Sequence, residues 1–286
     1  MKRAGLIAAV LVAGLAALWL YGMAQAAADP VARQAELTLP KMAPRTAPYR
    51  VALLSDIHFG NRAMRPERLA RIADQINAAK PDLIVIVGDF VNGKHGAPEP
   101  DPKGLTAPLA GLHARDGVVA TLGNHDHWTD ATAVRAALAG AGIEVLINQA
   151  AQRGPLLLLG IDDGYSRHAN IAAAIMTLPR QSNLPIVAIT HSPDLSPRLP
   201  SGITLVLAGH THCGQVVLPI IGALAPIFGK VIGDREYYDP HYQCGIVRDG
   251  PRTTIVTAGL GSGSVPIRIG APPDWWLISL DVPSMP

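Results

Sequence analysis

Aspartate, asparagine and histidine recur at one kind of position in this sequence, directly after short apolar stretches. Five such stretches lead into the groups Asp56-x-His58, Gly88-Asp89, Gly123-Asn124-His125-Asp126, His191 and Gly209-His210-Thr211-His212. Any one of these residues could form a turn, cap a helix or sit hydrogen-bonded in a loop. Carboxylate, amide and imidazole groups together, however, suit borderline divalent ions such as Zn, Mn, Fe and Co. The repetition at five places favours one metal centre over five unrelated turns.

Spacing within two of the groups also fits a shared centre. Asp56 and His58 lie two residues apart, as do His210 and His212. Residues two apart on an extended chain project from the same face, so each pair can face one centre. The neighbouring glycines allow the backbone to approach closely and to turn away.

The elements that must position these residues are predicted as buried strands. Apolar, β-branched runs precede the polar groups at 49–55, 82–88, 117–123, 185–190 and 203–209, and further strands are predicted at 144–148, 155–161, 253–259 and 274–280. Helical spacing predicts a helix over 65–79, Asp130 can cap a second helix through Ala139, and a short helix is expected near 169–178. This order predicts an α/β fold with helices on the outer faces of stacked sheets. In open α/β sheets, ligands bind beyond the carboxyl ends of strands.

Bulk composition excludes several classes of protein. The chain has 286 residues, of which 49% are hydrophobic and 16% charged, as is ordinary for a folded protein. A net charge of +2 and 5% aromatic residues provide no basic, base-stacking surface, so no nucleic-acid partner is expected. The two cysteines, Cys213 and Cys244, make no zinc motif, and their spacing leaves open whether they form a disulfide.

The N-terminus carries an uncharged apolar segment from Ala4 to Ala28, preceded by Lys2 and Arg3. Its length meets the ~20 residues that a membrane-spanning helix needs, and Trp19 and Tyr21 are placed as interface anchors. The sequence predicts a membrane anchor or signal segment at 1–28, a linker at 29–48 and one domain at 49–286.

A cleaved secretory signal is the alternative, because Ala24-Gln25-Ala26 has the small-x-small pattern of a cleavage site. The basic residues before the segment predict a cytoplasmic N-terminus and a domain on the non-cytoplasmic side of the cell membrane. Cleavage would leave a secreted or periplasmic protein. Arg33, Lys41 and Arg45 place positive charge on the other flank as well.

The ordered set of five groups resembles the calcineurin-like metallophosphoesterases, over roughly Arg50 to Leu280. The tail at 259–280 and the stretch AGHTHCGQ resemble more narrowly a membrane-associated bacterial branch with YkuE-like and UDP-2,3-diacylglucosamine pyrophosphohydrolase-like members. The resemblance implies a four-layer αββα sandwich. The chain departs from that branch at Cys213, where glycine is usual, and at Ala258, where arginine is usual, so its substrate could differ.

The resemblance also implies a dinuclear centre of two divalent ions, drawn from Mn, Zn, Fe and Co. One ion would be bound by Asp56, His58, Asp89 and His212, and the other by Asp89, Asn124, His191 and His210. His125 would contact the phosphate and protonate the leaving oxygen, with Asp126 orienting its ring. Asp162 and Asp163 are either turn residues or candidates for a loop near the substrate.

The expected function is hydrolysis of a phosphoester or pyrophosphate bond in a phosphorylated small molecule or a lipid-linked, cell-envelope substrate. A non-catalytic metal-binding scaffold and a nuclease or phosphodiesterase on the same fold are the alternatives. Residues 216–233 form an apolar stretch in which proline and glycine forbid a regular helix. It is either a hairpin folded onto the core, the favoured interpretation, or an exposed apolar lip beside the metal centre.

Overall fold

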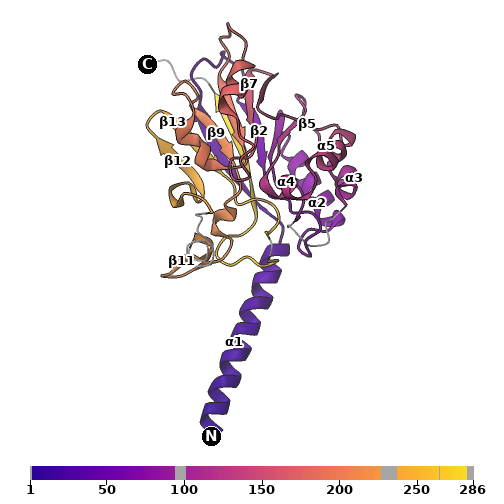
Figure 1. Cartoon of the computed structure of the whole chain (residues 1–286), viewed down its shortest axis with the longest axis vertical. Coiled ribbons are helices and arrows are strands. Elements are labelled where there is room, and N and C mark those ends of the chain that lie inside the picture. The colour runs from indigo at the N-terminus through magenta and orange to yellow at the C-terminus, as the bar shows by residue number, and fades with distance from the viewer. Residues whose placement is uncertain (1, 94–100, 227–236, 264, 282–286) are drawn as a thin grey trace.

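Two six-stranded mixed sheets form the centre of the fold (Figure 1). The computed structural model describes residues 2–93, 101–226, 237–263 and 265–281. The first sheet has the strand order β1 (Val31–Thr38), β14 (Asp274–Asp281), β2 (Tyr49–Leu54), β3 (Leu83–Val87), β4 (Val118–Thr121) and β5 (Glu144–Val145). The second has the order β12 (Gly245–Asp249), β13 (Arg252–Val256), β9 (Leu205–Ala208), β8 (Ile186–Thr190), β7 (Leu156–Ile161) and β6 (Gln149–Arg153).

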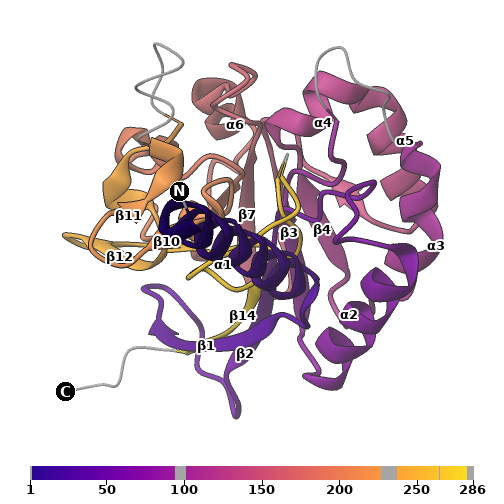
Figure 2. The same ribbon diagram turned by 90° about the horizontal axis from the view of Figure 1, so that it is seen from below.

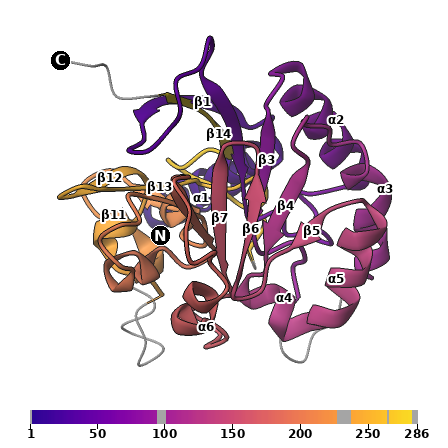
Figure 3. The same cartoon turned by 90° about the horizontal axis from the view of Figure 1, so that it is seen from above.

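Helices cover the outer faces of the two sheets, as Figure 3 shows from above. The helices are α1 (Lys2–Ala27), α2 (Pro66–Ala78), α3 (Thr106–Leu109), α4 (Asn124–Thr129), α5 (Ala131–Gly140) and α6 (Ile171–Met176). Short 3-10 turns lie at Pro102–Leu105, Pro193–Arg198, His212–Gly214 and Pro240–Tyr242, and β10 (Val217–Leu218) and β11 (Gly222–Ala223) form a small hairpin. The helices expected at 65–79, after Asp130 and near 169–178 are confirmed, and the Asp130 carboxylate caps α5 by accepting from two backbone N–H groups.

The central strands are buried on both faces, and their alternate residues belong to two different cores. Alternate residues of β2, such as Val51 and Leu53, face the second sheet and pack against residues such as Leu158 and Leu207. The intervening residues of the first sheet pack beneath α2, α3 and α5. The outer face of the second sheet is covered by α6 and the turn at Pro193–Arg198. The expected αββα layering of an α/β fold is therefore confirmed.

The segment predicted as a linker, 29–48, instead contributes a strand to the first sheet. β1 pairs in parallel with β14 along its whole length. The side chains that face inward include Arg33, whose guanidinium forms an ion pair with the buried carboxylate of Asp274. A charged residue at an inward position hid the alternation of this strand, because its partner lies 241 residues away in the chain.

Cys213 and Cys244 form a disulfide, with Cα atoms 4.7 Å apart. The bond ties the turn that follows His212 to the start of β12. Closing a loop of 31 residues stabilises the fold by about 3–4 kcal/mol in the chain-entropy model. Disulfides persist mainly in oxidising compartments, and this bond is therefore relevant to where the domain resides.

Helix α1 projects from the domain and is long and apolar enough to cross a membrane (Figure 1). An 18-residue window within Arg3–Ala27 has a mean hydropathy of 2.2, and 6% of that window is buried. Only its last turns touch the domain: the Arg268 backbone N–H donates to the Gly22 carbonyl at 2.9 Å, and Ala26 is fully buried. Figure 2 shows α1 from below, with the β10–β11 hairpin beside it.

Candidate metal centre

The candidate residues gather where strands of both sheets end. Asp56 follows β2, Asp89 follows β3, and Asn124 opens α4 just after β4. From the second sheet, His191 follows β8 directly, and the loop with His210 and His212 follows β9. The loops hold one another, since the Asp56 N–H donates to the Gly88 carbonyl and the Gly209 N–H to the His191 carbonyl.

Backbone geometry marks these loops as specialised. Residues with side chains and positive φ are uncommon, and they concentrate at functional sites. Five candidate residues have φ between 50° and 70°: Asp56, His58, Asp89, His210 and His212. Each such residue costs of the order of 1–3 kcal/mol, which the surrounding fold must offset. This strained backbone conformation turns the polar side chains toward one point.

Two motif glycines are required by close packing. A Cβ atom on Gly209 would lie 1.9 Å from Ser55 Oγ, and one on Gly123 would lie 2.3 Å from Asp89 Oδ1. No side chain fits at either position, so the glycines let the two loops approach the aspartates.

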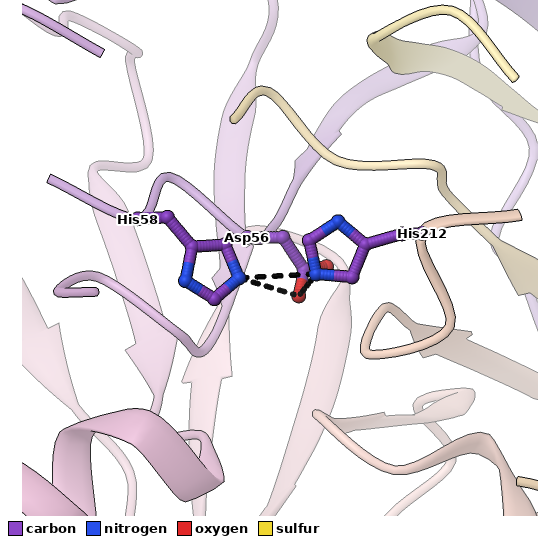
Figure 4. A group of neighbouring side chains, drawn as sticks. All are labelled: Asp56, His58 and His212. Carbon is purple, nitrogen blue, oxygen red and sulfur yellow. Dashed lines mark hydrogen bonds and ion pairs between the residues drawn. The ribbon is translucent and has the colours of Figure 1, made fainter. Parts of the chain in front are cut away.

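One cluster joins Asp56, His58 and His212 (Figure 4). The Nε2 atoms of His58 and His212 lie 3.0 Å apart. Asp56 Oδ1 lies 3.3 Å from His212 Nε2 and 3.8 Å from His58 Nε2. All three side chains are buried or nearly so.

A second cluster, with Asp89 at its centre, lies beside the first. Asp89 Oδ2 is 3.2 Å from His191 Nε2 and 3.6 Å from His58 Nε2, so it faces both clusters. His210 Nδ1 lies 3.2 Å from His191 Nε2. Asn124 is 2% exposed, and it lines the same cavity as His210.

Backbone carbonyls set the tautomers of the second cluster. His191 Nδ1 donates to the Val87 carbonyl at 2.7 Å, and His210 Nε2 donates to the Tyr237 carbonyl at 2.9 Å. The remaining nitrogens, His191 Nε2 and His210 Nδ1, therefore face each other. An imidazole held in this way presents a defined nitrogen to a metal.

The donor set fits divalent metal ions. Two ligand atoms each ~2.1 Å from one ion, at octahedral or tetrahedral angles, lie about 3.0–3.4 Å apart. The closest contacts within each cluster, 3.0 and 3.3 Å in one and 3.2 Å twice in the other, match that range. Asp56 Oδ1 and Asn124 Oδ1 are buried and have no hydrogen-bond partner within the described part of the chain. Buried oxygens of this kind are costly unless a ligand satisfies them.

Charge in the clusters points the same way. Burial raises the pKa of Asp56, and its nearness to Asp89 adds to that rise. Burial also favours the neutral form of Asp89, but the charges of His191 and His125 outweigh it and hold the pKa of Asp89 well below its usual range. Burial and neighbouring positive charges lower the pKa of His58 and His212 well below normal, so both rings are neutral. Neutral imidazoles beside carboxylates are ready metal ligands. His191 differs: burial favours its neutral form, but Asp89 and Asp56 hold its pKa well above its usual value, so a metal would have to displace the proton that its Nε2 shares with Asp89.

His125 lies at the rim of this centre. One of its ring nitrogens is within 4.8 Å of ligand atoms of His58 and Asp89, and the rings of His58 and His125 meet edge to face. His125 Nδ1 donates to the Gly93 carbonyl, 2.5 Å away. The Nε2 atom is thereby left for a substrate.

The role expected for Asp126 is corrected by the structure. Its carboxylate accepts the backbone N–H groups of Asp89, Phe90, Val91 and Gly123, instead of contacting the His125 ring. Burial and nearness to Asp89 raise the pKa of Asp126 to about 7. Asp126 thus fixes the loop after β3 against the start of α4, while Gly93 orients His125.

Arg268 is a buried residue that the sequence did not reveal. Its guanidinium donates to the carbonyls of Ala258, Gly261 and Ala271, and Nη2 lies 3.1 Å from His212 Nδ1. The side chain is fully buried, and burial lowers its pKa to about 10. Its positive charge is one cause of the lowered pKa of His212, so Arg268 favours the neutral ring. The nearby sequence is uncharged except for this arginine, which could have been a signal for it.

Asp163 supports the site from outside. Ser192 Oγ donates to Asp163 Oδ1 at 2.6 Å, which fixes the residue that follows His191. Asp162 instead pairs with His127, at 2.8 Å from its Nε2. Both aspartates are buried, and neither is a simple surface turn residue.

A cavity of about 760 Å³ opens over the clusters. The metal-centre side chains Asn124, His125, His210 and His212 lie in its wall. The rest of the described wall is mostly apolar or aromatic and includes Trp128, Tyr165, Tyr237, Tyr238, Val216, Leu224, Ala225, Val265 and Ile267. The aromatic residues come from segments far apart in sequence. No local sequence pattern predicted that they would line one cavity.

The apolar stretch 216–233 is described only as far as residue 226. In that part it forms the β10–β11 hairpin, but the favoured interpretation, a hairpin folded onto the core, is wrong for the tip of that hairpin. The hairpin tip does not fold onto the core: Ile220 is fully exposed and Ile221 is 60% exposed. Val216 and Leu224, at the base of the hairpin, line the cavity.

Residues 49–214 match the family model described as calcineurin-like phosphoesterase. The match begins with β2 and ends just after His212, so it spans all seven candidate ligands. The segment after residue 214 belongs to the same domain. Its strands β12 and β13 lie in the second sheet and β14 lies in the first.

Named proteins with similar sequences include membrane and bacterial examples. A zebrafish (Danio rerio) transmembrane protein with metallophosphoesterase domain is 30% identical over 275 residues, or 90% of this chain and 58% of that protein. The uncharacterized metallophosphoesterase YkuE of Bacillus subtilis is 28% identical, over 81% of this chain and 79% of its own. The phosphodiesterase YaeI of Escherichia coli is 29% identical, over 76% of both chains. This chain therefore spans little more than half of the zebrafish protein.

Proposed function

This chain belongs to the calcineurin-like phosphoesterase family, and we propose that it is a membrane-anchored hydrolase of phosphoester or pyrophosphate bonds with two divalent metal ions. The observation that carries the proposal is the pair of clusters that Asp89 faces. Asp56, His58, Asp89 and His212 would hold one ion. Asp89, Asn124, His191 and His210 would hold the other.

Different residues of the chain would have different roles in hydrolysis. Two bound divalent ions would neutralise the phosphate charge and lower the pKa of an attacking water. Asp89 faces both clusters and so fixes the distance between the two clusters. His125, oriented by the Gly93 carbonyl, is placed to donate an Nε2 proton to the oxygen that leaves phosphorus. Water supplies the new oxygen on phosphorus, and the leaving alcohol or phosphate departs with the proton.

Hydrolysis of a defined panel tests the proposal. The metal-reconstituted protein is offered a 4-nitrophenyl phosphate monoester, bis(4-nitrophenyl) phosphate and a nucleoside diphosphate sugar, which present the three bond types. Turnover of at least one is expected, and cleavage of the pyrophosphate would favour the UDP-2,3-diacylglucosamine pyrophosphohydrolase-like branch. Failure on all three with Mn, Zn, Fe and Co would favour a non-catalytic metal-binding scaffold.

We further propose that α1 stays attached and that the domain lies on the non-cytoplasmic side. Three observations support this placement. Lys2 and Arg3 precede the apolar helix, and the domain contains a disulfide. Ala26, in the alternative cleavage site, is buried against the domain.

Fractionation is expected to leave the full-length protein with membranes after both high-salt and alkaline washes, because a spanning helix is held by the bilayer core. A peripheral membrane protein of the same cells, released by alkali, serves as control. Recovery of a soluble chain that starts near Ala27 would show cleavage and contradict the anchor.

A further inference from the structure

The cavity over the metal centre has an unusual wall for an enzyme that binds an anion. Among its described lining residues there is no lysine, arginine, aspartate or glutamate. Beyond the metal-centre side chains the wall is mostly aromatic and aliphatic, with residues such as Trp128, Val265 and Ile267, while Thr211 and Gln215 add two uncharged polar side chains. Its volume, about 760 Å³, is within the range of sites that enclose a sizeable organic ligand. Such a wall suits a substrate whose phosphate reaches the metals and whose remainder is apolar.

The cavity also lies where the membrane would begin. A span of ~20 residues at 1.5 Å per residue crosses a hydrocarbon core of ~30 Å. Counted from Ala4, the twentieth residue of α1 is Met23. Its neighbour Gly22 packs against Ile267: a Cβ atom on Gly22 would lie 3.0 Å from Ile267 Cβ. Ile267 lines the cavity, so one wall of the site adjoins the expected edge of the bilayer.

The β10–β11 hairpin extends the same edge. It lies at the end of the domain from which α1 emerges (Figure 1), and it joins that region because the Val217 N–H donates to the Ile269 carbonyl at 2.8 Å. Its tip exposes Ile220 completely and Ile221 by 60%.

The backbone conformation of Ile220 is a second reason to connect its exposure with lipid contact. It has a φ of 72°, which is a genuine outlier for a β-branched residue. A polar residue or glycine would suit both the water and this backbone better. An apolar side chain exposed on this hairpin, at the end of the domain from which α1 emerges, fits contact with lipid.

We propose that the substrate is a membrane-resident phosphoester lipid, whose hydrocarbon chain enters the cavity from the bilayer between α1 and the β10–β11 hairpin. The inference rests on the proposed phosphoester hydrolysis and narrows its substrate class. The hairpin tip dips into the bilayer, the apolar wall receives the chain, and the phosphate meets the metal centre. Hydrolysis then releases one product to water and leaves the other in the membrane.

Two phosphodiesters that differ only in chain length provide the test: methyl and hexadecyl 4-nitrophenyl phosphate. The full chain, metal-reconstituted in phosphatidylcholine vesicles, is compared with the double variant Ile220→Asn/Ile221→Ser. Asparagine tolerates the positive φ of position 220. Met176→Ser is the matched control, because Met176 is 85% exposed on α6 and is not among the described residues of the cavity wall.

The wild-type protein is expected to hydrolyse the hexadecyl ester with a kcat/KM at least about tenfold above that of the methyl ester. The hairpin variant should lose about tenfold on the hexadecyl ester while its Tm and its rate on the methyl ester stay unchanged. Met176→Ser should change neither rate.

Three results would overturn the inference. Equal kcat/KM for the two esters in the wild type would show that no chain is bound, with phosphoester hydrolysis itself left intact. A parallel loss of both rates and of Tm in the hairpin variant would show that the tip is structural. Hydrolysis of neither ester by a wild type that cleaves the monoester or the nucleoside diphosphate sugar would overturn the inference alone, whereas failure on those substrates as well would remove the proposed function.

Discussion

Replacement of Asp89 by asparagine is expected to lower hydrolysis by at least about 10⁴-fold and to weaken metal binding in both clusters. Asp89 Oδ2 faces His58 and His191 at once, and its lowered pKa keeps it a carboxylate. The amide has nearly the same shape but lacks the charge that two cations would share. The amide oxygen of asparagine can still accept the backbone N–H of His125, which Asp89 Oδ1 accepts at 2.8 Å. The loop after β3 should therefore keep its place.

Metal analysis and kinetics on the same preparation check this expectation. Asp74→Asn is the matched control. Asp74 is exposed on α2 and belongs to neither cluster, so this change removes the same charge outside the metal centre. Retention of two ions per chain by Asp89→Asn, or loss of only one while the other stayed tightly bound, would contradict a role for Asp89 in both clusters.

His125→Ala is expected to reduce turnover by ~10²–10⁴-fold, the usual range for a lost general acid, with metal content near normal. The loss should depend on the leaving group. A 4-nitrophenolate departs without a proton, so the variant should approach wild-type rates on 4-nitrophenyl esters more closely than on alkyl esters. This split distinguishes proton donation from simple damage to the centre.

The control is His113→Ala, which removes an exposed imidazole elsewhere. Equal losses on both kinds of ester would mean that His125 serves another purpose, such as binding the phosphate. Full activity of the variant on alkyl esters would refute any role of His125 in the chemistry.

The strand-end position of the candidate ligands could be predicted because it depends on local patterns. Apolar, β-branched runs gave the strands, and the parallel strands β2, β3 and β4 bring Asp56, Asp89 and Asn124 to one edge. Stacking of two sheets then brings His191 to the same place, where it donates to the Val87 carbonyl. The order of strands and helices was enough to predict helices on the outer faces of stacked sheets.

Features that depend on long-range partners could not be predicted. Arg33 lies in the segment predicted as a linker, yet it pairs with Asp274. Arg268, for which the sequence predicted no role, is enclosed by backbone carbonyls. The disulfide required Cα atoms at 4.7 Å, which spacing alone cannot show. Asp126 adjoins His125 in sequence, yet its carboxylate turns back to the backbone of the β3 loop, where four N–H groups converge.

The number of divalent ions bound per active chain decides whether the centre is dinuclear. Metal-stripped protein is titrated with Mn²⁺ or Zn²⁺, and bound metal is measured by mass spectrometry alongside hydrolysis of bis(4-nitrophenyl) phosphate. Two ions per chain are predicted, with full activity only when the second has bound, because Asp89 joins two clusters and each has its own buried, unpartnered oxygen within the described chain. Full activity at one ion per chain, or at none, would contradict the dinuclear centre.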